Sequence, residues 1–193
     1  QLLARGHRRR GGGRGRGRRL RVNYRTTDEI RKWAVSQLAN CSIDDLDGQP
    51  DTLVGYHSLV HGISPDVVSS ASRTEEHIAI DKCLNRLKDN GIPMRNVCLV
   101  VRTNEEASEY AKWLESTGRQ AIKLDRDTSD NQEKAGVRVA TMHRVKGLEF
   151  DAVIIAGYRS PEHYADVYGA EEDAGVMLDN LTSERCLLHV AAT

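Results

Sequence analysis

The sequence predicts an α/β fold in three layers, with helices on both faces of a mainly parallel sheet. From residue 66 onward, apolar runs rich in β-branched residues alternate with amphipathic segments, the pattern of βαβ units. Three of the amphipathic segments begin with Ser or Thr followed three residues later by Glu, the pattern of a capping box. The run VCLVV at residues 97–101 is apolar throughout, as in a strand covered on both faces.

Each element follows from a local signal along the chain. The capping boxes are Thr26-x-x-Glu29, Ser72-x-x-Glu75 and Thr103-x-x-Glu106, and glycines at 91 and 118 are expected to end the second and third helices. The expected helices cover residues 26–40, 72–90 and 103–117, with a last one starting at Thr182 or Ser183. The expected strands cover residues 20–24, 53–54, 58–60, 66–70, 97–101, 121–124, 137–141 and 152–157. The remaining stretches are expected to be loops, including a long acidic one at residues 158–180.

The net charge of zero conceals an uneven distribution of charge. Residues 1–25 contain ten Arg and no acidic residue, so the other 168 residues carry 18 Lys+Arg against 28 Asp+Glu, a balance of −10. The Arg/Gly-rich residues 1–19 offer almost nothing apolar for a core and are expected to be a disordered arm. This arm is either a plain linker or, like RGG segments, an electrostatic clamp on phosphates.

Several classes of protein are excluded by composition. The four cysteines are scattered without a CxxC pair, which argues against a zinc site and favours a reducing compartment. No apolar run approaches the roughly 20 residues that a membrane-spanning helix needs. The arginine-rich start has no apolar segment of the kind found in secretory signals. The sequence therefore predicts a cytoplasmic protein with no resident metal and no membrane partner.

The most informative stretch is residues 137–157, VRVATMHRVKGLEFDAVIIAG. A polar connection separates two strand-like runs, and in open α/β sheets ligands bind at the carboxyl ends of the strands. The connection concentrates chemically useful side chains, namely Thr141, His143, Arg144, Lys146, Glu149 and Asp151, around Gly147. This density predicts a functional loop, whereas an ordinary solvated connector is the alternative.

Four stretches carry a family resemblance. TMHRVKGLEFD resembles motif V of superfamily 1 helicases of the UvrD/Rep type, and LRVNYRTTD at residues 20–28 resembles motif IV. VCLVVRTNEEA at residues 97–107 is similar to the strand and turn that present Arg and Asn to single-stranded DNA in this family. TSERCLLHVAAT at residues 182–193 resembles the start of motif VI. The resemblance implies a RecA-like domain of the P-loop NTPase type.

The resemblance also implies roles for particular residues. The positions that match ATP contacts are Tyr24, Arg25, Gly147 and Glu149. The positions that match nucleic-acid contacts are Arg102, Asn104, Thr141, His143 and Lys146. Simpler roles remain open, because Thr103 or Asn104 is also needed to cap a helix and Tyr24 is also suited to a half-buried strand. Glu184 and Arg185 match the early polar pair of motif VI or are first-turn helix residues.

Several features of complete helicases are missing from this sequence. The sequence contains no GxxxxGK[ST] phosphate loop and no acidic Walker B strand, so the N-terminal RecA-like domain that holds ATP and Mg²⁺ is expected to be separate. The motif VI arginine would be residue 194, which makes residues 20–193 a truncated domain. Only about a dozen residues separate the strand at 121–124 from residue 137, which leaves no room for the 2B insertion of many relatives.

These observations predict the C-terminal RecA-like (2A) domain of an ATP-dependent DNA helicase. The resemblance implies translocation from 3′ to 5′ on single-stranded DNA and a place in DNA repair, replication or recombination. The chain alone is expected not to hydrolyse ATP. One alternative is a nucleic-acid-binding module that uses the Arg/Gly arm on a degenerate helicase-like scaffold, and another is a structural domain of a larger complex.

Overall fold

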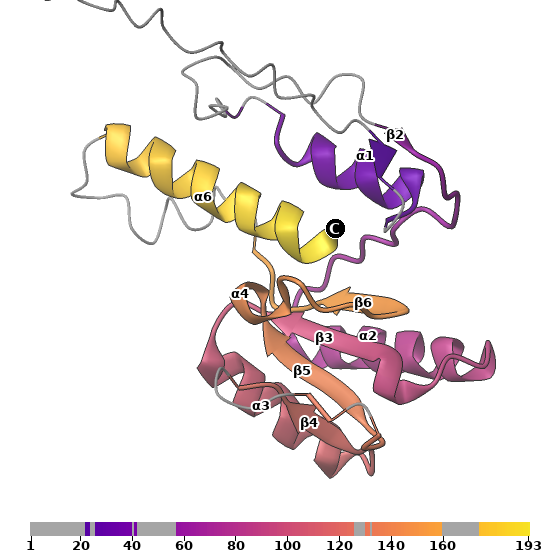
Figure 1. The fold of residues 1–193 in the computed structure, drawn as a ribbon. Coiled ribbons are helices and arrows are strands. Elements are labelled where there is room, and N and C mark those ends of the chain that lie inside the picture. Colours follow the sequence, from indigo (N-terminus) through magenta and orange to yellow (C-terminus); the bar gives the residue numbers. More distant parts are fainter. Residues whose placement is uncertain are drawn as a thin grey trace, which may run out of the picture.

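The fold is known from a computed structural model, which describes residues 22–23, 26–39, 41, 57–125, 130–131, 133–159 and 174–193 (Figure 1). In this part of the chain, four parallel strands form the central sheet in the order β4-β5-β3-β6. Their bounds are β3 Val97–Val101, β4 Ala121–Lys123, β5 Val137–Thr141 and β6 Ala152–Ile155. The predicted α/β fold with a mainly parallel sheet is thus confirmed.

The register of the strands brings their carboxyl ends to one edge of the sheet. Val101 pairs with Thr141, so β3 and β5 end side by side, and Val100 pairs with Ile155 of β6. The loops that leave this edge begin at Arg102, Met142 and Ala156. We refer to this edge as the carboxyl edge.

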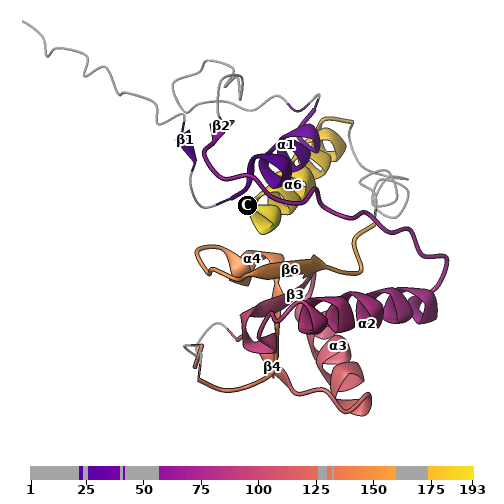
Figure 2. The same ribbon diagram turned by 90° about the vertical axis from the view of Figure 1, so that its right-hand side faces the viewer.

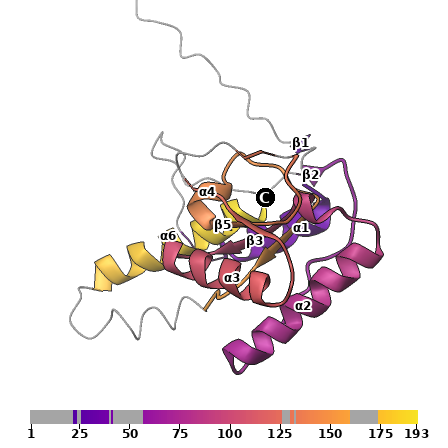
Figure 3. The same ribbon diagram turned by 90° about the horizontal axis from the view of Figure 1, so that it is seen from below.

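Helices lie on both faces of the sheet. On the lower face in Figure 2 lie α2 Arg73–Asp89 and α3 Asn104–Ser116, and Figure 3 shows this face from below. On the upper face lie α1 Asp28–Ser36, the short α4 Met142–Val145 and the long α6 Ala174–Ala192. The 3-10 turn η1 Met94–Asn96 leads into β3. The expected three layers are present.

The lower face is covered by segments close to one another in sequence. Val97, Leu99 and Val101 of β3 point to this face and are fully buried. They pack against buried apolar residues of the two helices, among them Leu84 of α2 and Leu114 of α3. Alternate residues of a strand point to opposite faces, so the continuous apolar run of β3 serves two separate cores.

The upper face is covered by segments far apart in sequence. Cys98 and Val100 of β3 meet Met142 and Val145 of α4 and Leu188 of α6 in a second buried cluster. Parts of the connection between β5 and β6 and of α1 pack partly buried around it, among them Leu148, Phe150 and Trp33. Helix α6 contacts both α1 and α4, which assembles the upper layer.

Three stretches differ from the secondary structure that the sequence predicted. Residues 66–70 form no strand; they belong to an exposed irregular segment, 59–70, because Val67 and Val68 find no sheet to pair with. Residues 142–145 are helical, although the sequence predicted a loop. Helix α6 begins at Ala174, eight residues before Thr182, so part of the expected acidic loop is helical.

The capping boxes differ in their outcome. Thr103 and Glu106 form the complete box at α3. At α2, Ser72 caps as predicted, but Glu75 accepts from the Ala71 amide. At α1 the box is wrong. Thr27 is the cap, and Glu29 accepts from the Gly62 amide.

A two-stranded parallel pair, β1 Val22–Asn23 and β2 His57–Ser58, lies beside α1. The buried carboxylate of Asp28 holds this corner together. It accepts from the Ser58 amide and forms ion pairs with Arg31 and Lys32. These bonds, led by that of Lys32, hold the pKa of Asp28 far below its usual range. Leu53 and Val54 lie outside the described residues.

Within the described residues, no helix has both the length and the apolar character that crossing a membrane requires.

Candidate functional site

The carboxyl edge brings together residues that are widely separated in sequence. Because Val101 and Thr141 are partners in the sheet, Arg102 directly after β3 lies near the start of α4 directly after β5. Asn104 opens α3 beside them, and His143 is on α4. Four of the five predicted nucleic-acid positions therefore lie at or next to the ends of two neighbouring strands, where open α/β sheets bind ligands.

Arg102 is held by α6. Its Nε donates to both carboxylate oxygens of Glu184 at 3.0 Å, and its Nη2 donates to Oε1 at 2.6 Å. The Arg102 side chain keeps 32% of its surface exposed and that of Glu184 keeps 16%. Glu184 lies in the middle of α6, so its interpretation as a first-turn helix residue is wrong. Arg185, the other residue of the pair, instead donates to the Ala39 carbonyl in the turn that follows α1.

The turn between β3 and α3 is fixed by one carboxylate. Glu106 accepts from the amides of Arg102 and Thr103, each at 3.1 Å, while Thr103 caps the helix. The cap is thus Thr103, and Asn104 is the first helical residue with an exposed side chain. The Asn104 side chain is not required by the cap and faces solvent at the carboxyl edge.

The connection that resembles motif V begins with α4 and has both buried and exposed positions. Thr141 caps the helix, its hydroxyl accepting from the Arg144 amide at 3.3 Å. Met142 and Val145 are buried, whereas His143 and Lys146 are exposed. A hydroxyl that accepts one hydrogen bond can still donate its own proton, so the cap leaves Thr141 able to contact a phosphate oxygen.

The second half of the same connection runs away from the carboxyl edge. The Asp151 amide donates to the Asn96 carbonyl at 2.9 Å, just before the amino end of β3. Glu149 is two residues from that bond. The sequence predicted the whole connection at the carboxyl edge, but only its first half lies there. Gly147 has φ +83°, a conformation that favours glycine, and no atom lies near where its Cβ would be.

The residues predicted to approach ATP are only partly described. Tyr24 and Arg25 lie outside the described residues, and the exposed Glu149 is far along the connection. One contact lies next to the stretch that contains Tyr24 and Arg25. The Thr26 hydroxyl donates to the Thr193 carbonyl at 2.9 Å. The stretches that resemble motifs IV and VI therefore meet, at the start of α1 and the end of α6.

Sequence reasoning missed a polar cluster at the carboxyl edge. The Glu76 carboxylate accepts from the Gly157 amide and from the Tyr110 hydroxyl, each at 2.6 Å, and Arg73 also bonds Tyr110. Burial and the hydrogen bond to Glu76 raise the pKa of Tyr110 well above its usual range. The cluster joins α2, α3 and the end of β6. The sequence contains no short motif that could have indicated it, because its members lie up to 81 residues apart.

Arg138 was also missed, as a charged residue inside a buried strand. Its side chain has no exposed surface and pairs with Asp130 at 3.2 Å. It also donates to the carbonyls of Asn131, Lys134 and Gly136. These bonds fix the end of the short connection between β4 and β5, where the sequence left no room for an insertion.

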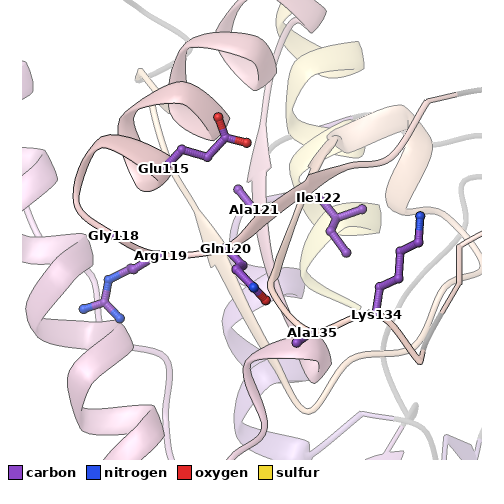
Figure 4. Close-up of a pocket in the computed structure, with 8 residues that line it drawn as sticks. All are labelled: Glu115, Gly118, Arg119, Gln120, Ala121, Ile122, Lys134 and Ala135. Atoms are coloured by element: carbon purple, nitrogen blue, oxygen red, sulfur yellow. The ribbon is translucent and has the colours of Figure 1, made fainter.

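An open hollow of about 700 Å³ lies at the opposite, amino edge of the sheet (Figure 4). Glu115 and Arg119, at the end of α3, and Lys134 contribute charged side chains to its wall. None of the predicted site residues lines it. Within the described residues, no group of His, Cys, Asp or Glu could hold a metal ion. Burial raises the pKa of the Cys98 thiol to about 12, so this cysteine is not a reactive centre.

Comparison with known proteins gives two findings. Residues 111–193 match the family described as the UvrD-like helicase C-terminal domain. The fold is similar to the crystal structure of the C-terminal domain of a possible DNA helicase from Lactobacillus plantarum WCFS1. That similarity has a TM-score of 0.57 and 20% sequence identity over 88% of this chain and 80% of that one. No curated protein matches. Residues 111–193 are thus similar to the C-terminal domain of UvrD-like helicases, and the neighbour shares the α/β fold of the chain.

Proposed function

We propose that this chain is the C-terminal motor domain of an ATP-dependent DNA helicase and that its carboxyl edge binds single-stranded DNA. The observation that carries this proposal is the meeting of Arg102, Asn104 and Thr141 at the ends of two neighbouring parallel strands. His143 and Lys146 add exposed polar and cationic side chains. Hydroxyl, amide and cationic groups are the donors that proteins use for phosphate and sugar contacts.

The proposal also includes contacts with ATP. The contact between Thr26 and Thr193 joins the stretches that resemble motifs IV and VI. The exposed Glu149 and the open surroundings of Gly147 present no steric obstacle to a ligand. By resemblance, Tyr24, Arg25 and Glu149 would contact ATP, whose hydrolysis would supply the energy for movement. Mg²⁺ would be held by the separate N-terminal RecA-like domain, and translocation would run from 3′ to 5′ in repair, replication or recombination.

DNA binding is tested by removing exposed charge at the carboxyl edge. The double substitution His143→Ala and Lys146→Ala is expected to weaken binding to a thymidine oligonucleotide. It should also make the dependence of log K on log salt less steep, by about 0.7 for each phosphate that is no longer neutralised. Lys112→Ala on the lower face is the matched control, since it removes one exposed lysine far from this edge. Fluorescence anisotropy measures both effects.

The same measurement separates the proposal from binding by the Arg/Gly arm. If the carboxyl edge binds DNA, a chain lacking residues 1–19 should retain oligonucleotide binding and remain sensitive to the two substitutions. If deletion abolishes binding and the substitutions change nothing, the arm is the binding element and the folded domain is a scaffold. The chain alone is expected to show no ATPase activity, because the sequence has no phosphate loop.

A further inference from the structure

We propose that Glu184 sets the strength of nucleic-acid binding at the carboxyl edge by competing with phosphate for the guanidinium of Arg102. This inference rests on the proposed function, because it assumes that phosphates approach that edge. In this inference Glu184, on α6, weakens nucleic-acid binding, whereas the cationic and polar residues of the proposed function strengthen it.

The geometry of the pair is that of a carboxylate occupying a phosphate-binding fork. The Glu184 carboxylate accepts three hydrogen bonds, of 2.6 to 3.0 Å, from the Nε and Nη2 of Arg102. Arginine uses the same planar donors to bind carboxylates and phosphates side-on. A phosphate that binds Arg102 through Nε and Nη2 must therefore displace the Glu184 carboxylate or share the guanidinium with it.

The surroundings strengthen this competition. Both side chains are more than half buried, so the pair is partly desolvated and less screened than a surface ion pair. The Arg102 backbone is fixed independently, since its amide donates to Glu106. Loss of the Glu184 charge should therefore leave the position of Arg102 at the end of β3 unchanged. The negative charge of Glu184 also repels phosphates at the same point.

The pair also links the carboxyl edge to the rest of the upper layer. From Glu184, helix α6 runs to Ala192, and the carbonyl of the next residue, Thr193, accepts from Thr26 just before α1. One residue along, Arg185 donates to the Ala39 carbonyl in the turn that follows α1. A phosphate that displaces Glu184 would thus remove one of the bonds that hold α6 in place.

The test is a double-mutant cycle between Glu184→Gln and Arg102→Ala in the full chain. A fluorescent thymidine oligonucleotide of roughly 16 nucleotides, at the upper end of single-strand site sizes, is the probe. Glu184→Gln should bind about threefold to tenfold more tightly than the unmodified chain, on the scale of one additional phosphate contact, with a salt slope steeper by about 0.7. The gain should vanish in the Arg102→Ala background.

Glu105→Gln is the matched control, because it removes one exposed carboxylate near Asn104 without touching Arg102. An equal gain from Glu105→Gln, or an equal gain from Glu184→Gln with and without Arg102, would show general charge repulsion and overturn the inference. Weaker binding by Glu184→Gln would show that Glu184 positions Arg102 for DNA, which also overturns it. If Glu184→Gln binds as tightly as the unmodified chain, and binding still requires His143 and Lys146, this inference is wrong but the proposed function is not contradicted. If neither the unmodified chain nor Glu184→Gln binds the probe, the proposed function itself fails.

Discussion

The two faces of the sheet are covered in different ways. The lower face receives α2 and α3, which flank β3 in the chain, and its cluster consists of apolar residues with the buried Tyr110. The upper face receives α4, which directly follows β5, together with α1 and α6, which lie toward opposite ends of the described chain. It also contains the fully buried Arg138, which lies on this face because its neighbours Val137 and Val139 belong to the lower cluster. The candidate site draws on both layers: Asn104 opens the lower helix α3, whereas the upper helices α4 and α6 carry His143 and Glu184.

The largest expected effect comes from the charge buried on the upper face. Arg138→Met should lower the free energy of unfolding by about 3–5 kcal/mol, since it leaves the carboxylate of Asp130, only 10% exposed, without its ionic partner. Three carbonyls lose their donor as well. Urea denaturation measures the loss. Adding Asp130→Asn to the same chain should recover part of the stability. A loss below about 1 kcal/mol would mean that the upper face does not depend on this polar cluster.

A matched pair of leucine substitutions tests whether the two faces unfold together. Leu114→Ala on the lower face should lower the global stability by about 2–5 kcal/mol, because it opens a cavity beneath the sheet. Leu188→Ala on the upper face should act more locally, with faster hydrogen exchange in α6 and α1 than in β3.

Hydrogen exchange followed by mass spectrometry separates these outcomes. In Leu188→Ala, peptides from residues 28–36 and 174–193 should lose protection while those covering residues 97–101 retain it. Equal loss of protection in all three regions would show one cooperative unit and remove the distinction between the faces.

The smallest expected effect is a pH dependence at the corner of α1. The folded pKa of Asp28 is depressed, chiefly by the bond from Lys32, so its stabilising contribution is present above the ordinary aspartate pKa of about 3.9. The contribution is lost as pH falls through the folded pKa. Asp28→Asn should therefore be less stable than the unmodified chain at pH 7, with a smaller difference at pH 3. Denaturation at the two pH values gives the comparison, and a difference that grows toward acid pH would contradict it.

Local sequence signals predicted the lower face well. The apolar run of β3 and the capping box at Thr103 and Glu106 are each contained in a few consecutive residues. Helix propensity, capping and strand periodicity act over such short distances, so they can be recognised in a single amino-acid sequence. The same local reading failed at residues 66–70, because β-branched residues form a strand only where a neighbour supplies hydrogen bonds.

The sequence by itself determined the fold class, the parallel strands and the candidate residues in the TMHRVKGLEFD and VVRTN stretches. Only the tertiary structure decided which of these residues meet. It placed Arg102 beside Thr141 and against Glu184, and it put Glu149 at the far end of the connection. It also joined Thr26 to Thr193 across 167 positions. The physical reason is that side-chain pairing between distant segments depends on sheet register and helix packing, which no local pattern of residue types specifies.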